Sequence, residues 1–111
     1  MSKAMATAEI SLSSIESNFN QARLAAPNSQ VMAVVKANAY GHGAIKVAQR
    51  LTTADAFAVA RLDEAVQLRE AGIQQPITLF GGICQASQAE VATDFDIDLV
   101  IHDQAQLELI K

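Results

Sequence analysis

Residues 54–82 read ADAFAVARLDEAVQLREAGIQQPITLFGG, with two short apolar runs on either side of an amphipathic segment. The runs, residues 56–60 and 77–80, have the length and near-continuous apolar character of strands in a parallel sheet. Residues 62–71 between them have apolar side chains at helical spacing, and Gly72 follows as a C-terminal cap. The stretch therefore predicts a strand–helix–strand unit with parallel strands.

The same alternation continues on both sides of this unit. Residues 30–36 predict a strand and residues 43–51 a helix, while a helix near residues 85–93 and a strand over residues 98–101 follow downstream. Four apolar strands separated by helices predict βα units around a parallel sheet covered on both faces. Doubly wound sheets and barrels both fit this pattern, and the number of strands does not choose between them.

Two further helices are indicated by their start signals. Ser13 followed three residues later by Glu16 has the spacing of a capping box, and it predicts a helix that runs toward Pro27. Asp103 with Gln106 has the same spacing near the end of the sequence. We expect a helix to begin there as well.

Composition limits the classes of function. A chain of 111 residues, 50% hydrophobic and 18% charged, is long enough for one globular domain with its own core. The net charge of −4 offers no basic surface for nucleic acid or an anionic membrane. Cys84 is the single cysteine, so no internal disulfide forms, and the first residues lack the apolar segment of a signal peptide. No stretch is long enough to span a bilayer, and we expect a cytoplasmic protein.

The segment 33–43, AVVKANAYGHG, places a lysine directly after an apolar run. Lys36 is predicted to be the last residue of its strand, on the same face as Met32 and Val34. The carboxyl end of the strands carries the ligand site in barrels and open α/β sheets alike. A partly desolvated amine there can act as a nucleophile or base. The alternative is that Lys36 simply extends into water at a strand end.

Other reactive side chains give weaker patterns. His42 and His102 lie far apart and have no neighbouring ligands at metal-binding spacing, so no metal site is expected. Cys84 has no activating partner in the sequence. The Gly81–Gly82 pair lacks the pattern of a P-loop or of a dinucleotide-binding fold.

The segment AVVKANAYGHG resembles the pyridoxal-phosphate signature of alanine racemases. Residues 54–82 resemble the second and third βα units of that family. A predicted strand over residues 7–12 and the helix containing NFNQARLAAP (residues 18–27) are similar to the first elements of its barrel domain. The resemblance covers nearly the whole sequence.

The resemblance implies roles for four residues. Lys36 matches the lysine that holds the cofactor as a Schiff base and acts as the base on the D-face of the substrate. Tyr40 matches the tyrosine that lies against the cofactor phosphate. Val34 and Phe80 match positions of the cofactor pocket, although the family usually has leucine or a similar residue in place of Phe80. The other motif residues, with weaker claims to chemistry and with glycines suited to a turn, are Asn38, Gly41, His42 and Gly43.

The resemblance also implies a fold and an activity. Alanine racemases combine a (β/α)8 barrel of TIM type with a C-terminal β domain, and they act as homodimers. Residues 1–111 match the N-terminal part of the barrel domain, about its first half, and contain no counterpart of the β domain. The implied reaction is the pyridoxal-phosphate-dependent interconversion of L- and D-alanine by two bases, which supplies D-alanine for cell-wall peptidoglycan.

The second base of the family is a tyrosine from the C-terminal domain of the partner subunit, and Tyr40 is the only tyrosine here. The 111-residue chain alone is therefore expected to be inactive. Two other functions stay open: a non-catalytic pyridoxal-phosphate-binding barrel protein, and an unrelated small α/β ligand-binding domain. The continuation ANAYGHG after the lysine speaks against the first, and the second requires the motif to be a coincidence.

Overall fold

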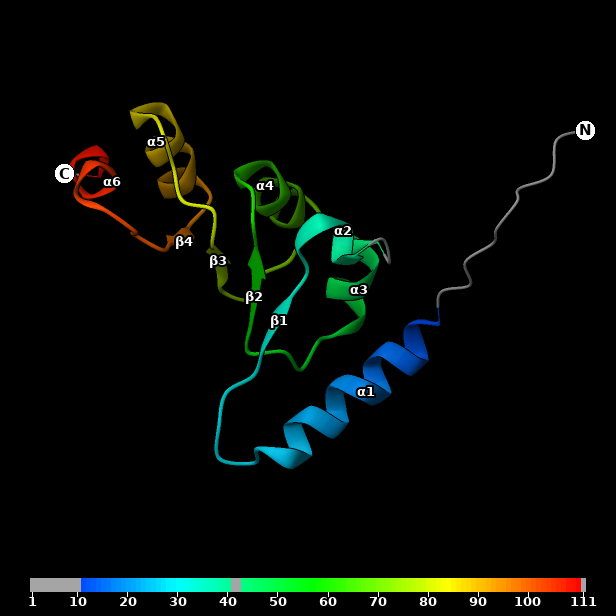
Figure 1. The fold of residues 1–111 in the computed structure, drawn as a ribbon. Coiled ribbons are helices and arrows are strands. Elements are labelled where there is room, and N and C mark those ends of the chain that lie inside the picture. The colour runs from blue at the N-terminus through cyan, green and yellow to red at the C-terminus, as the bar shows by residue number, and fades with distance from the viewer. Residues whose placement is uncertain (1–10, 41–42, 111) are drawn as a thin grey trace, which may run out of the picture.

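The computed structural model describes residues 11–40 and 43–110, and within them helices alternate with four strands (Figure 1). In chain order the elements are α1 (Leu12–Ala25), β1 (Met32–Val34), α2 (Lys36–Tyr40), α3 (Ala44–Arg50), β2 (Ala56–Val59), α4 (Leu62–Glu70), β3 (Ile77–Leu79), α5 (Ala86–Asp94), β4 (Ile97–Leu99) and α6 (Gln104–Leu109). Among these residues, no helix is both long and apolar enough to cross a membrane.

The four strands form one parallel sheet in the order β1-β2-β3-β4. Phe57 of β2 pairs with Ala33 on one side and with Ile77 on the other, and Ile77 in turn pairs with Ile97. Each new strand is added on the same side of the one before it. A doubly wound sheet reverses its strand order at a switch point, whereas a barrel wall adds strands in one direction. The α/β class is confirmed, and the strand order is that of a barrel.

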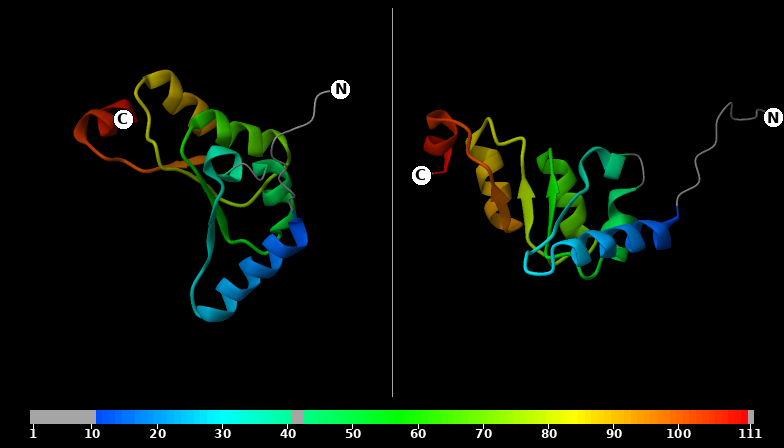
Figure 2. Two further views of the ribbon diagram at one scale, coloured as in Figure 1. Left: turned by 45° about the vertical axis from the view of Figure 1, so that its right-hand side comes forward. Right: turned by 60° about the horizontal axis from the view of Figure 1, so that its bottom comes forward.

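The hydrophobic core lies between the sheet and the helices on one of its faces. Phe57, Val59, Ile77 and Leu79 are completely buried there. In the left view of Figure 2, α5, α4 and α3 form an arc along one side of the strands. Each large apolar side chain buried in this layer contributes about 1.5–3 kcal/mol relative to an exposed position. This layer is therefore the main source of stability for the described residues.

The opposite face of the sheet is open. Val34 pairs with Ala58, Ala58 with Thr78, and Thr78 with Asp98, so these side chains share that face. Met32 and Val34 remain 45% and 39% exposed. The predicted cover on both faces is wrong for the described residues, because the helices pack against one face only. In a barrel, the uncovered face is the one that points inward.

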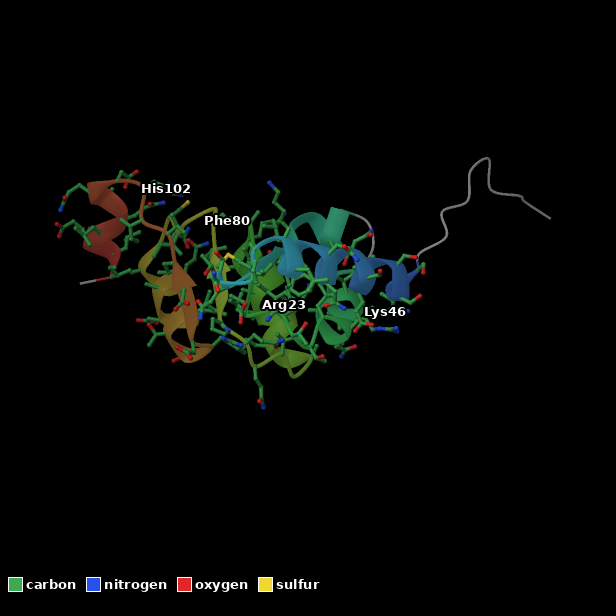
Figure 3. The ribbon with its side chains drawn as sticks, turned by 90° about the horizontal axis from the view of Figure 1, so that it is seen from below. Arg23, Lys46, Phe80 and His102 are labelled. Atoms are coloured by element: carbon green, nitrogen blue, oxygen red, sulfur yellow. The ribbon has the colours of Figure 1, made fainter. Side chains whose placement is uncertain are left out.

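Helix α1 is attached to the amino ends of the first two strands by a side-chain bridge. Arg23 donates from Nη1 to the Thr53 carbonyl at 2.9 Å and to the Asp55 carboxylate at 3.2 Å, and Asp55 also accepts from Val31 N at 2.7 Å. Figure 3 shows Arg23 reaching from α1 toward the sheet. The bridge lies at the opposite end of the strands from Lys36.

The helix ends test the start and stop signals in the sequence. Gly72 has a φ of 92° after α4, which is the left-handed conformation expected of a C-terminal cap. Asp103 caps α6 by accepting from Gln106 N at 2.8 Å, as predicted. The start of α1 differs: the cap is Ser11, which accepts from Ser14 N at 3.2 Å, and not Ser13.

The first predicted strand, over residues 7–12, is wrong at its end and untested elsewhere. Ser11 and Leu12 belong to the start of α1, and residues 7–10 lie outside the described part of the chain.

Candidate active site

The parallel ladder continues beyond the strand ends. Three backbone hydrogen bonds extend it: Val35 N to Ala58 O at 2.8 Å, Phe80 N to Val59 O at 2.8 Å, and Val100 N to Leu79 O at 3.2 Å. Continuing the register by one residue from Val59 and Leu79 pairs Ala60 with Phe80 at the carboxyl edge. Lys36 follows Val35, the last residue of the first strand's ladder, at the same edge.

Lys36 lies at this edge but not within the strand. The assigned strand ends at Val34, and Lys36 is the first residue of the short helix α2. The prediction that Lys36 ends the strand is therefore wrong in detail, because the chain turns directly after Val35 pairs with β2. Lys36 is half-buried, whereas Val34 is exposed on the open face. The placement at the carboxyl edge agrees with the sequence.

The turn after Lys36 is organised by Asn38. Its backbone has a φ of 56°, a left-handed conformation that asparagine tolerates better than most residues. Its side-chain Oδ1 accepts from Ala44 N at 2.8 Å, and its carbonyl accepts from Gly43 N at 2.9 Å. Gly43 has a φ of 87° where α3 begins, so the turn role predicted for this glycine is confirmed. Asn38 thus fixes the path from Lys36 into α3.

Tyr40, Gly41 and His42 of the motif are not fully described by the structure. Tyr40 is the last residue of α2, but the placement of its side chain lies outside the described part. Gly41 and His42 lie outside the described residues altogether. Their predicted roles therefore rest on the sequence.

Phe80 lies at the same edge as Lys36, and its side chain is 36% exposed. By strand alternation from buried Leu79, it belongs to the open face with Thr78. The loop after it is closely packed against β2: a Cβ added to Gly81 would lie 2.1 Å from the Ala60 carbonyl oxygen. Phe80 is thus followed by a backbone that has no room for a side chain at the next position.

Three βα loops at this edge use the same capping device. Glu64 accepts from Ala60 N and Arg61 N at 3.1 and 2.9 Å. Gln88 accepts in the same way from Cys84 N and Gln85 N, and Gln106 accepts from His102 N. Each acceptor is the third residue of its helix, the position at which Glu or Gln binds the backbone before the helix. The sequence already contains this spacing, because Glu64 follows Arg61 by three residues.

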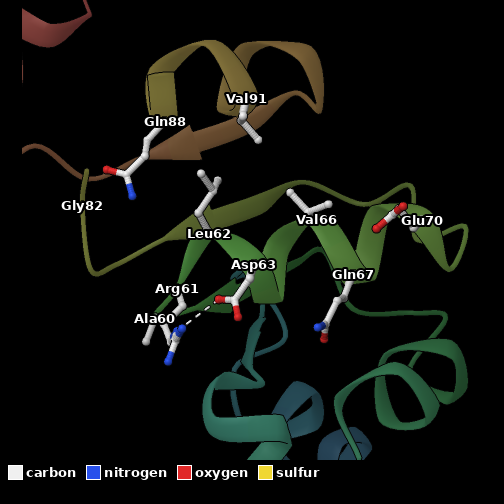
Figure 4. Close-up of a pocket in the computed structure, with 10 residues that line it drawn as sticks. All are labelled: Ala60, Arg61, Leu62, Asp63, Val66, Gln67, Glu70, Gly82, Gln88 and Val91. Atoms are coloured by element: carbon white, nitrogen blue, oxygen red, sulfur yellow. Dashed lines mark hydrogen bonds and ion pairs between the residues drawn. The ribbon is translucent and has the colours of Figure 1, made fainter. Parts of the chain in front are cut away.

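A groove of about 690 Å³ runs between α4 and α5, with Leu62, Val66 and Val91 facing one another across it (Figure 4). Its polar rim includes an exposed ion pair, with Arg61 Nε 3.1 Å from Asp63 Oδ1. The lining contains none of the predicted site residues. The groove belongs to the helical side of the sheet.

The remaining reactive groups do not form a separate cluster. Within the described ranges, no three His, Cys, Asp or Glu side chains are arranged to hold a metal ion. His102 Nε2 is 2.8 Å from the Phe80 carbonyl oxygen, a contact that the sequence did not predict. Cys84 is exposed.

Comparison with known proteins identifies the family. The model of the alanine racemase N-terminal domain matches residues 10–111. An alanine racemase from Nitrosococcus oceani is 49% identical over 102 residues, which cover 92% of this chain and 29% of that protein. One from Shewanella baltica is 46% identical over 104 residues, with coverages of 94% and 29%.

Solved structures agree with these matches. Alanine racemase from Acinetobacter baumannii superposes with a TM-score of 0.87 at 39% identity, over 91% of this chain and 28% of that one. The biosynthetic alanine racemase from Pseudomonas aeruginosa superposes with a TM-score of 0.86 at 44% identity, over 90% of this chain and 28% of that one. The chain spans about 29% of the length of the curated relatives it matches. From its sequence and its partial barrel fold, this chain belongs to the alanine racemase family, within the N-terminal domain.

Proposed function

We propose that this chain carries the cofactor lysine of a pyridoxal-phosphate-dependent racemase that interconverts L- and D-alanine. The observation that supports this most directly is the position of Lys36, directly after β1 at the carboxyl edge and within the segment AVVKANAYGHG. Family membership supports the reaction class. Because the chain spans under a third of its relatives, the activity is a property that we propose for the complete gene product.

The residues at this edge fit the cofactor chemically. Pyridoxal phosphate requires a primary amine for its covalent attachment and apolar surfaces for its ring. Lys36 offers the amine, while Val34 and Phe80 offer exposed apolar surface on the open face. Lys46, the other lysine among the described residues, is exposed on α3, and Figure 3 shows it far from Phe80. The edge therefore combines the required groups, and Lys46 lies apart from it.

Each residue has a proposed task. Lys36 would hold the cofactor through its amine and, once released by the substrate amine, move a proton at the α-carbon on one face. Tyr40 would bind the phosphate, and Val34 and Phe80 would contact the ring. Asn38 would keep the Lys36 backbone in place through its two hydrogen bonds to the start of α3. When bound, the cofactor supplies an electron sink that stabilises the charge left by the departing α-proton.

Racemisation also needs a proton donor or acceptor on the other face of the α-carbon. Tyr40 is the only tyrosine in the sequence and follows Lys36 by four residues. As the resemblance to alanine racemases implies, we propose that the second base is a tyrosine from the C-terminal domain of the partner subunit in a homodimer. Residues 1–111 alone would then lack turnover, in keeping with the exposed inner face at Met32 and Val34.

The remaining proposals follow from the same assignment. Residues 1–111 would form the N-terminal part of a pyridoxal-phosphate-binding (β/α)8 barrel domain. The enzyme would act in the cytoplasm, where its product D-alanine enters peptidoglycan synthesis.

Racemisation by the complete gene product and its Lys36→Ala variant tests the proposal. D-alanine formation from L-alanine should be measured together with the visible absorbance of the cofactor. We expect turnover and bound cofactor in the wild type, and no turnover in Lys36→Ala with a retained fold, because Lys36 is not part of the buried hydrophobic core. Bound cofactor without turnover in the wild type would instead support a non-catalytic cofactor-binding barrel protein. No binding at all would contradict the proposal.

A further inference from the structure

Two side chains of the fourth βα unit bind the backbone of the third. His102 Nε2 lies 2.8 Å from the Phe80 carbonyl oxygen, which makes this nitrogen the donor. Gln106 Nε2 donates to the Ile83 carbonyl at 3.4 Å, a longer and weaker bond. We call His102, Gln106 and their two carbonyl partners the loop bridge. It joins both ends of the segment from Phe80 to Ile83 to the next loop.

The two donors are also joined to each other. Gln106 Oε1 accepts from His102 N at 2.6 Å, and Gln106 N donates to Asp103 Oδ1 at 2.8 Å. The side chain of Gln106 therefore uses both ends of its amide, one toward its own loop and one toward the Phe80 loop. Its orientation is fixed by these opposed bonds, because only the oxygen can accept from His102 N.

The bridged segment is confined on both sides. A Cβ added to Gly81 would lie 2.1 Å from the Ala60 carbonyl oxygen at the end of β2. A Cβ added to Gly82 would lie 2.2 Å from Gln106 Nε2, and the backbone there has a φ of 74°. The Gly81–Gly82 pair therefore allows the loop to lie between the second and fourth βα units. Real Cβ atoms do not approach other atoms this closely, so neither glycine can be replaced without a shift.

Phe80 is the residue whose position depends on this arrangement. Its amide is bound to Val59 O at 2.8 Å, and its carbonyl is bound by His102. Its side chain remains 36% exposed at the carboxyl edge. Bonds to the backbone on both sides of a residue fix the direction of its Cα–Cβ bond. Figure 3 shows Phe80 and His102 near each other at one side of the molecule.

We propose that His102 is a positioning residue for the cofactor pocket, acting through the Phe80 carbonyl, with Gln106 as its support. This rests on the proposed function, because Phe80 is assigned there to the ring of pyridoxal phosphate. His102 touches neither cofactor nor substrate in this proposal. It holds the loop in the conformation in which the Phe80 side chain is already placed for binding. Without His102, part of the free energy of cofactor binding would be used to order the loop, and the affinity would fall.

The test uses the complete gene product with His102→Leu, His102→Gln and Gln106→Leu. Leucine removes the donor, whereas glutamine keeps an N–H at a similar distance from the backbone. Gln104→Leu is the matched control on the same helix, because the Gln104 amide contacts Glu108 and not the loop. Four quantities are measured: hydrogen exchange of the peptide covering residues 79–85, the dissociation constant for pyridoxal phosphate, and both kcat and KM at saturating cofactor.

We expect His102→Leu to speed exchange in this peptide and to weaken cofactor binding about two- to tenfold, the range of one neutral hydrogen bond. His102→Gln should restore both quantities to within about twofold, and Gln104→Leu should change neither. Gln106→Leu should act in the same direction as His102→Leu. Because the bridge acts on cofactor binding, kcat at saturating cofactor should change less than twofold.

The other outcomes separate the two proposals. Faster exchange with unchanged cofactor affinity in His102→Leu would overturn the positioning role. Unchanged exchange would show that the bridge does not hold the loop. Failure of the wild-type protein to bind the cofactor would contradict the proposed function, and the positioning role would fall with it. The exchange measurement would still decide whether His102 orders the loop.

Discussion

Replacing Arg69 by methionine should loosen two turns at once. Its guanidinium donates to four backbone carbonyls, those of Ile73, Gln75, Phe95 and Asp96, at 2.8–3.0 Å. The first two belong to the loop between α4 and β3, and the other two follow α5. One half-buried side chain therefore joins two consecutive connections at the amino end of the strands.

The expected cost follows from these bonds. A hydrogen bond from a charged donor contributes about 1.5–3 kcal/mol, but the carbonyls regain water when a partly exposed donor is removed. We therefore expect Arg69→Met to lower the stability of the two turns by about 2–4 kcal/mol, near the upper part of the range for single substitutions. If amides in these turns exchange by local opening, each 1.4 kcal/mol of lost stability raises their exchange rate about tenfold. The expected loss therefore corresponds to a rise of roughly 30- to 800-fold in the exchange rate.

Amides in the two turns report the change. Ile73 N donates to Leu68 O at 3.1 Å, and Phe95 N donates to Val91 O at 3.0 Å. Exchange of peptides containing these amides should be measured by mass spectrometry in the complete gene product, with and without Arg69→Met.

Arg61→Met is the matched control. Its guanidinium makes one exposed ion pair with Asp63, with side chains 75% and 58% accessible, and such pairs contribute about 0–1 kcal/mol. Arg69→Met should therefore accelerate exchange far more than Arg61→Met does. Equal effects of the two substitutions would refute the reasoning that the four carbonyl contacts stabilise these turns.

Three further predictions concern Tyr40, Asn38 and Gly81. Tyr40→Phe should weaken pyridoxal-phosphate binding by about 1.5–3 kcal/mol in a spectrophotometric titration; normal binding with collapsed turnover would show that its role is different. Asn38→Ala loses the hydrogen bond to the start of α3 and must still adopt a φ of 56°, so the free energy of unfolding measured with denaturant should fall by about 1–3 kcal/mol. Asn38→Gly should lower it less, because glycine adopts this φ without strain. The reverse order would contradict the backbone reasoning. In Gly81→Ala the new methyl group would meet the Ala60 carbonyl, and the free energy of unfolding should fall by about 2–3 kcal/mol. Gly72→Ala, where the added Cβ has nothing within 4 Å, should lower it by about 1–2 kcal/mol. Equal losses of stability would argue against a steric origin.

The regular elements could be predicted from the sequence because their signals are local. Apolar runs separated by amphipathic segments identified all four strands of the described sheet to within a few residues, and Gly72 identified the end of α4. The strand order could not be read from spacing, because doubly wound sheets and barrels share the same rhythm. The short helix α2 was missed, because residues 36–40 directly follow a strand and precede a glycine, as a turn does.

The site was predictable in part for a different reason. The resemblance of one contiguous motif to a family identified Lys36, and strand periodicity placed it near the carboxyl edge. The contacts of Arg69 and His102 could not be predicted, because they join residues separated by 26 and 22 positions. Such bonds depend on how neighbouring βα units pack, and no local pattern encodes them.

Chemical labelling of the cofactor lysine tests the central claim most directly. Borohydride reduction of the complete gene product with bound pyridoxal phosphate makes the bond between cofactor and lysine permanent, and peptide mapping then locates it. We predict the label on the peptide that contains Lys36, no label in Lys36→Arg, and an unchanged label in Lys46→Arg, since Lys46 is exposed on α3. A label on Lys46 or on Lys111 in the wild-type protein would contradict the account.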